Sequence, residues 1–300
     1  MLPLLRTLLM AFGAALTLLG GPCRAQAPLP VVASFSILGD LVRGVGAERV
    51  TVTTLVGPDE DAHVFEPKPA HAKAILQSRL LVVNGLGFEP WAARLARSAG
   101  YQGTTLVASQ GVRGRTLTDG NGHTETDPHA WQDPNNGVLY VRNIAAALSR
   151  LDPAGAALYQ RNSDALVQQL LSLDAWAKAR FAALPAAKRK VITSHDAFGY
   201  FAARYGLQFS APQGVSTDAE PSAQGVARLI RQIRREKIRA VFLENMGDPK
   251  LLSQLSKDAG VELGASLYAD ALSAPDQPGA TYLQMLRYNV TQLVAGMQRN

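Results

Sequence analysis

Apolar and polar positions follow two alternating periods along the chain, and this pattern predicts short strands separated by helices. Apolar or β-branched runs at 31–35, 50–56 and 80–85 are typical of strands. Between them, 37–45 and 69–78 have the apolar spacing of helices. Because helix and strand alternate, we expect an α/β fold with a mostly parallel central sheet and helices on both faces.

A long helix is predicted in the middle of the chain. Asp152 is a favourable N-cap and Pro153 a favourable first helical residue. No Gly or Pro interrupts 156–184, where apolar residues recur at helical spacing until Pro185 ends the run. Such a helix is about 45 Å long at 1.5 Å per residue. It is long enough to run along two lobes and join them.

The alternation repeats after this helix. Strands are predicted at 190–193, 240–243 and 262–267, and helices at 198–205, 222–236, 249–259 and 280–297. Residues 111–127 are rich in Gly, Thr and Asp and predict a surface loop. We therefore expect two similar α/β lobes, 26–151 and 186–300, joined by one long rigid helix over 152–185.

Residues 1–25 have the features of a signal peptide. Arg6 precedes an apolar stretch at 8–19, which at about 12 residues is too short to span a bilayer. Small residues follow it, so we expect export and cleavage near Ala25. A lipoprotein signal needs a small residue before its cysteine, whereas Pro22 precedes Cys23, so a soluble exported protein is favoured. The mature chain then lacks cysteine, which excludes disulfides and thiolate chemistry.

Composition narrows the function classes further. With 47% apolar and 18% charged residues, the chain is neither disordered nor a coiled coil. The net charge of +6 is not gathered into a long basic run, so no nucleic-acid partner is expected.

The histidines carry the chemical signal. Three of the five lie at the ends of strand-like runs or in polar loops, as does one aspartate: His63, His129, His195 and Asp270. Open α/β sheets place ligand sites at such strand ends. Three imidazoles and a carboxylate suit Zn²⁺ well and Mn²⁺ less well, and neighbouring carboxylates would orient the rings: Asp61, Asp127 and Asp196. Spacing alone leaves open whether these histidines are ligands or buried and capping residues.

Eight short segments carry motifs that are specific in combination: 61–69 (DAHVFEPKP), 83–91 (VNGLGFEPW), 127–131 (DPHAW), 194–201 (SHDAFGYF) with 204–207 (RYGL), 220–222 (EPS) with 242–244 (FLE), and 267–270 (LYAD). Together they resemble the zinc- and manganese-binding substrate-binding proteins of ABC transporters. The resemblance spans nearly all of the mature chain.

This resemblance implies a metal site in the cleft between two lobes. His63 and His129 would come from the first lobe, and His195 and Asp270 from the second. Members that look manganese-selective often carry a carboxylate at the third ligand position, so His195 favours zinc. The implied function is that of a periplasmic, monomeric zinc carrier that delivers Zn²⁺ to the membrane permease of an ABC importer.

The chain departs from the zinc-binding members in one segment. They often carry a long loop rich in His and acidic residues before the second ligand motif, whereas 115–127 is short and holds only His123. A strong auxiliary zinc reservoir is therefore not expected. His123 is interpreted as a solvated loop residue or a transient ligand, and His71 as a surface residue or a neighbour of the site.

Alternative functions are a manganese carrier, a zinc hydrolase and an exported adhesin. His63 and Glu66 have a spacing found in some zinc peptidases, but Pro67 argues against a helix that aims both at one metal. The chain has no His-Glu-x-x-His, and a catalytic zinc usually keeps three protein ligands and an open position. We therefore expect a carrier with no catalytic residues. An adhesin would need a binding surface that the sequence neither shows nor excludes.

Overall fold

The computed structural model describes residues 27–118 and 124–300. The predicted signal peptide, with Cys23, and His123 lie outside the described residues. Within the described part, none of the helices combines the length and the apolar character that crossing a membrane requires.

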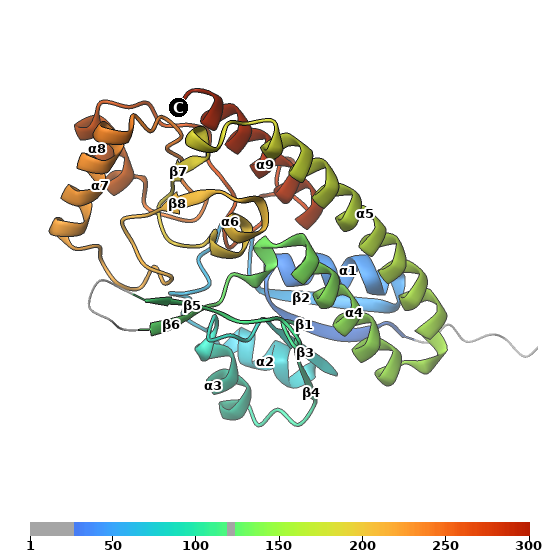
Figure 1. Ribbon diagram of the computed structural model, residues 1–300. Coiled ribbons are helices and arrows are strands. Elements are labelled where there is room, and N and C mark those ends of the chain that lie inside the picture. The colour runs from blue at the N-terminus through green and yellow to red at the C-terminus, as the bar shows by residue number, and fades with distance from the viewer. Residues whose placement is uncertain (1–26, 119–123) are drawn as a thin grey trace, which may run out of the picture.

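A four-stranded parallel sheet forms the first half of the molecule, with strand order β2-β1-β3-β4. The strands are β1 (Leu29–Phe35), β2 (Val50–Val56), β3 (Leu80–Val83) and β4 (Thr104–Val107). Figure 1 shows helices on both faces, α1 (Ser36–Gly46) and α4 (Pro134–Leu151) opposite α2 (Pro69–Gln77) and α3 (Pro90–Ser98). The predicted parallel α/β architecture is confirmed here, and β4 is a strand that the sequence pattern did not indicate.

The segment predicted as a surface loop contains a β-hairpin, so that prediction is wrong in part. Strands β5 (Arg115–Thr118) and β6 (Thr124–Asp127) pair antiparallel, with Arg115 opposite Asp127. Both strands are rich in threonine, which favours extended backbone, but they lack the apolar alternation that reveals a half-buried strand. The end of β6 leads directly towards His129.

The second half contains a smaller sheet than the sequence predicts. Strands β7 (Lys190–Ile192) and β8 (Gln208–Ser210) pair in parallel. The strands expected at 240–243 and 262–267 reduce to single bridges, between Ile192 and Val241 and between Glu244 and Leu267. Gly264 lies against the Phe242 ring with no room for a side chain, and the regular pairing is interrupted there. Helices α6 (Gly199–Tyr205), α7 (Ala223–Glu236) and α8 (Pro249–Ala259) complete this half.

The predicted long helix is present as α5 (Ala156–Ala182), which follows a short 3₁₀ turn at Pro153–Gly155. It runs along both halves of the molecule (Figure 1). Its early apolar residues, such as Leu170, pack in the first buried cluster, whereas Phe181 packs in the second. One helix therefore contributes to both cores.

The last helix, α9 (Tyr282–Gln298), does the same. Its first turn, including Tyr282 and Leu286, belongs to the first cluster, and Leu293 and Met297 belong to the second. The chain thus returns to the first core before it ends. The sequence indicated one connecting helix, whereas in the described part of the chain α5 and α9 both span the two cores. The short helix α6 also contributes to both, with Tyr200 in the first cluster and Phe201 and Tyr205 in the second. The division into lobes at 152 and 186 stays a prediction.

Substitution of neighbouring leucines tests the role of α5. Leu170 is 1% exposed, so Leu170→Ala should lower the free energy of unfolding by about 2–5 kcal/mol through lost burial and a cavity. Leu171 is 42% exposed, so the same change there should stay within about 0.5 kcal/mol. Urea unfolding of the metal-free proteins measures both. Equal effects would show that α5 does not pack as described.

Candidate metal centre

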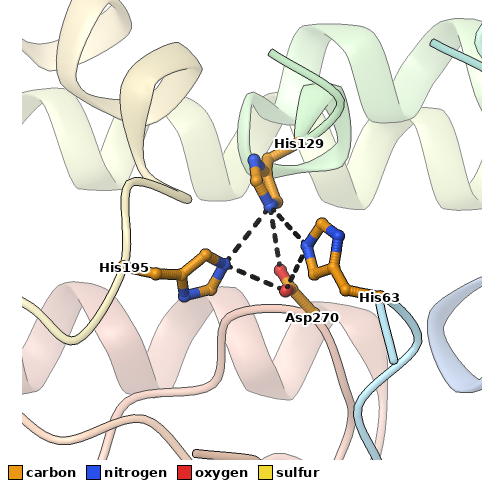
Figure 2. Close-up of side chains that lie close together, drawn as sticks. All are labelled: His63, His129, His195 and Asp270. Carbon is orange, nitrogen blue, oxygen red and sulfur yellow. Dashed lines mark hydrogen bonds and ion pairs between the residues drawn. The ribbon is translucent and has the colours of Figure 1, made fainter. Parts of the chain in front are cut away.

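Four side chains from distant parts of the chain converge at one point (Figure 2). His63 comes from the loop after β2, His129 follows β6, His195 follows β7, and Asp270 precedes α9. One ligand atom from each lies within 4.8 Å of the others. The structure therefore brings together the quartet indicated by the sequence, and its role as a ligand set stays a prediction.

The separations between these atoms fit a single small cation. Nε2 of His129 lies 3.4 Å from Nε2 of both His63 and His195. Asp270 Oδ2 lies 3.3 Å from His63 Nε2 and 3.1 Å from His195 Nε2, and its Oδ1 lies 3.5 Å from His129 Nε2. A tetrahedral ion with bonds of about 2.0–2.1 Å needs ligand atoms about 3.3–3.4 Å apart.

The Asp270 carboxylate is the strongest sign that a cation belongs here. Both of its oxygens are buried, and neither accepts a hydrogen bond from the described residues. Burial opposes ionisation, but the charges of His129 and His195 outweigh it and hold the pKa of Asp270 well below its usual range. An ionised, buried carboxylate without hydrogen bonds is costly unless a positive charge compensates it.

Two carboxylates orient the imidazoles from outside the quartet. Asp127 Oδ1 lies 3.0 Å from Nδ1 of His129, and Glu244 Oε2 contacts Nδ1 of His195. A carboxylate on one ring nitrogen directs the other nitrogen towards the metal. Asp127 was expected in this role. Glu244 was not, although its place after the apolar run 242–243 is the same signal that singled out Asp270.

The other two expected carboxylates act differently. Asp61 Oδ1 accepts a hydrogen bond of 2.8 Å from the backbone N–H of His63, so it shapes the loop and leaves the ring free. Among the described residues, Asp196 makes no hydrogen bond with any of the three rings. The ring of His63 instead lies edge-on to Phe88, with centroids 4.8 Å apart.

The remaining candidates from the sequence do not join the centre. His71 Nδ1 accepts a hydrogen bond from the backbone N–H of Lys68 at the start of α2, which is a capping role. Glu66 is exposed and is not part of the group of ligand atoms. The spacing between His63 and Glu66 that suggests a peptidase therefore has no counterpart in the structure.

Access to the centre is unequal among the four residues. The side chains of His129, His195 and Asp270 are fully buried, whereas that of His63 is 5% exposed. His63 also lines a cleft cavity of about 600 Å³ whose walls come from both halves of the chain: Leu86, Gly87, Phe88, Pro90, Glu125, Thr126 and Pro128 on one side, and Val215, Ser216 and Asp218 on the other. Solvent therefore reaches the centre past His63.

Comparison with known proteins extends these observations. The family model described as the zinc-uptake complex component A, periplasmic, matches residues 31–296. The manganese-binding lipoprotein MntA of Halalkalibacterium halodurans is 31% identical over 271 residues, which cover 90% of this chain and 89% of that protein.

Two solved structures are similar over their whole length. The periplasmic zinc binding protein TroA from Treponema pallidum superposes with a TM-score of 0.85 at 28% identity, covering 91% of this chain and 99% of that one. A Mn-bound periplasmic metal binding protein from Candidatus Liberibacter asiaticus has a TM-score of 0.80 at 29% identity, covering 89% of this chain and 98% of that one. The similar proteins are thus named for zinc and for manganese.

Removal of Glu244 tests how His195 is oriented. Glu244→Ala should weaken metal binding about 10–100-fold, because the His195 ring loses the carboxylate that directs its Nε2. Glu220→Ala, which removes an exposed carboxylate, should leave affinity unchanged. Competition with a chromophoric chelator measures both affinities. An unaltered affinity in Glu244→Ala would show that this contact is dispensable.

Metal binding should release protons at neutral pH. Burial lowers the pKa of His129, but Asp270 and Asp127 outweigh it and raise that pKa to about 9; Glu244 and Asp270 likewise raise the pKa of His195. Because a ligand imidazole must be neutral, the apparent affinity should fall as the pH drops below about 9, well above the ordinary imidazole value of about 6.5.

Calorimetry in two buffers of different ionisation enthalpy measures this release. A binding enthalpy that varies with the buffer gives the number of protons displaced. A buffer-independent enthalpy at neutral pH, with affinity constant up to pH 9, would contradict the raised pKa values.

Proposed function

We propose, since this chain belongs to the family of periplasmic zinc-uptake components, that it captures Zn²⁺ and delivers it to the permease of an ABC transporter for import. The chain is a substrate-binding protein of a metal ABC transporter. The observation that carries the metal-binding part of this proposal is the buried Asp270 carboxylate, which accepts no hydrogen bond among the described residues and faces three imidazole nitrogens. The three histidines carry the choice of zinc.

Binding of cargo accounts for the site better than catalysis does. Catalytic zinc sites usually have three protein ligands and keep one position for water or substrate. Here four protein side chains surround one point, and three of them are fully buried. Such a site holds an ion firmly and gives a substrate molecule little access to it. The matching family model describes an uptake-complex component, and similar proteins are named as substrate-binding lipoproteins of ABC transporters.

The donor set favours zinc over manganese. Imidazole nitrogen suits Zn²⁺, whereas Mn²⁺ is suited by carboxylate, carbonyl and water oxygens in octahedral geometry. Three of the four residues of the quartet are histidines. Five separations between their Nε2 atoms and the Asp270 oxygens are 3.1–3.5 Å, close to the distance of about 3.3–3.4 Å between neighbouring ligand atoms around a tetrahedral zinc ion.

Manganese is the second candidate because of how Asp270 is turned. Its Oδ2 faces His63 and His195 while its Oδ1 faces His129. A carboxylate that binds through both oxygens would raise the coordination number above four, which suits Mn²⁺. Similar proteins are also named for manganese.

A metal titration decides between these ions. We expect one Zn²⁺ per chain, bound more tightly than Mn²⁺, and a large loss of affinity in Asp270→Ala because a buried charged ligand is removed. Asp218→Ala is the matched control, since this exposed carboxylate lines the cleft but lies outside the quartet. Competition with a chromophoric chelator measures each ion. Equal or tighter binding of Mn²⁺ would overturn the zinc assignment and leave metal transport standing.

The exported form is proposed to be soluble in the periplasm. Several similar proteins are named as lipoproteins. In this chain Pro22 stands directly before Cys23, where a lipoprotein signal needs a small residue. Intact-mass spectrometry of the exported protein should therefore give a chain that begins near Gln26. A lipid-modified Cys23 at the N-terminus would contradict this expectation.

A further inference from the structure

The segment that carries Asp270 is attached to the first half of the molecule. The carbonyl of Ala269 accepts hydrogen bonds from Trp131 Nε1 at 3.0 Å and from Gln132 Nε2 at 2.6 Å. Both donors lie in the short 3₁₀ helix at Ala130–Gln132, directly after His129. The turn that follows His129 is therefore bonded to the residue that precedes Asp270.

The other end of this segment is attached in the same way. The backbone N–H of Leu272 donates to Ser36 Oγ at 2.9 Å, at the start of α1. The carbonyl of Leu272 accepts a bond of 2.9 Å from the backbone N–H of Asp59, in the loop that carries His63. Asp270 thus lies between two anchoring points on the first half, each close to a histidine of the quartet.

The residues just before this segment have different partners. The backbone N–H of Leu267 donates to Leu243, and Tyr268 exchanges two hydrogen bonds with the Asn289 side chain on α9. The partners therefore change between residues 268 and 269. After that point one bond leads back to the second half, from Asn245 Nδ2 to the carbonyl of Ala271, and it is long at 3.3 Å.

The backbone around His195 is attached to the second half, and the next hydrogen bonds of this stretch with the first half come at Tyr200, whose hydroxyl accepts from the N–H of Arg115 and donates to the carbonyl of Asp127. The backbone N–H groups of His195 and Ser194 donate to Glu244 Oε1, and the N–H of Asp196 donates to the carbonyl of Gly214. Among the described residues, 193–197 make no hydrogen bond with the first half outside the quartet itself. By the hydrogen bonds of the surrounding backbone, His63, His129 and Asp270 are held by the first half and His195 by the second. The sequence instead predicted two residues from each lobe.

We propose that the ion first binds a preformed half-site of His63, His129 and Asp270, and that His195 engages last as the second half closes on it. The proposal rests on the function proposed above. Gln132 is a positioning residue: its amide holds the carbonyl next to Asp270 and so keeps this carboxylate with the two histidines.

Contacts at the rim fit such a closing step. Thr217 Oγ1 donates to Asp61 Oδ2 and Asn245 Nδ2 donates to Asp59 Oδ1, both at 2.7 Å. These bonds join side chains of the second half to the loop that carries His63, and both pairs lie at or near the surface. They are bonds that closure would form without rearranging the half-site.

Rapid mixing with Co²⁺ tests the order of binding, because the visible absorption of this ion reports its coordination. Wild type should show a first phase whose rate rises with Co²⁺ concentration and a second phase that is independent of it. His195→Ala should keep the first phase and lose the second. Asp270→Ala should lose the first phase, or form a complex that dissociates at least about tenfold faster.

Gln132→Leu tests the positioning role. The Oε1 of this buried amide has no hydrogen-bond partner among the described residues, so an apolar replacement sacrifices only the bond to Ala269. The first complex should dissociate about tenfold faster, with no further effect in the Asp270→Ala background. Asn136→Leu is the control, since it loosens the same 3₁₀ helix through Ala130 without touching Ala269. Gln132→Met replaces Gln132→Leu if thermal unfolding shows that the latter does not fold.

Three outcomes distinguish the proposals. Retention of the first phase in Asp270→Ala together with its loss in His195→Ala would overturn the three-plus-one order and leave the metal-carrier function intact. A Gln132→Leu effect that persists unchanged in the Asp270→Ala background would remove the positioning role. Failure of wild type to bind Co²⁺ or Zn²⁺ at all would instead overturn the proposed function.

Discussion

A negative charge buried without hydrogen bonds is the constraint on which the rest of the structure depends. Asp270 is fully buried, and three imidazole nitrogens face its oxygens. Burial opposes protonation of His129, but the Asp270 carboxylate outweighs it and raises the pKa of His129 to about 9, because a protonated imidazole compensates the buried negative charge. A bound divalent cation would compensate that charge in the same way. The neighbouring carboxylates of Asp127 and Glu244 stabilise positive charge at the centre, whether a protonated imidazole or a metal ion carries it.

The fold brings this charge and its neighbours together through non-local contacts. His129 and Asp270 are 141 positions apart by number, yet the side chains after His129 bind the carbonyl before Asp270. The helices α5 and α9 pack in both cores and so join the two halves. Because the loops leave from strand ends on either side, a small displacement of one half changes the distance from His195 to the other three.

Local chemistry explains which parts of the structure the sequence could predict. The long helix was predictable because no Gly or Pro interrupts its apolar spacing, and α8 was predicted with its observed bounds between Pro249 and Ala259. The predicted start of the long helix was wrong: the Asp152 carboxylate does not cap it but accepts hydrogen bonds from Arg49 and Tyr159, and α5 begins only at Ala156 after the 3₁₀ turn. The β5–β6 hairpin was missed because its strands are polar, so burial leaves no trace in the pattern. The strands at 240–243 and 262–267 were overestimated, because apolar runs indicate burial but not continuous pairing. The four candidate residues were recognisable from motifs, whereas the Glu244 contact and the attachment of Asp270 depend on tertiary packing.

The return of the chain to the first core has a consequence for how the molecule can be divided. A fragment that stops before residue 269 would lack Asp270 and also Tyr282 and Leu286, which are buried in the first cluster. A fragment that begins after the long helix would carry those residues without the core they belong to. Cutting the chain between the halves therefore leaves the first core incomplete, and a nascent chain completes this core only after Leu286 has been synthesised.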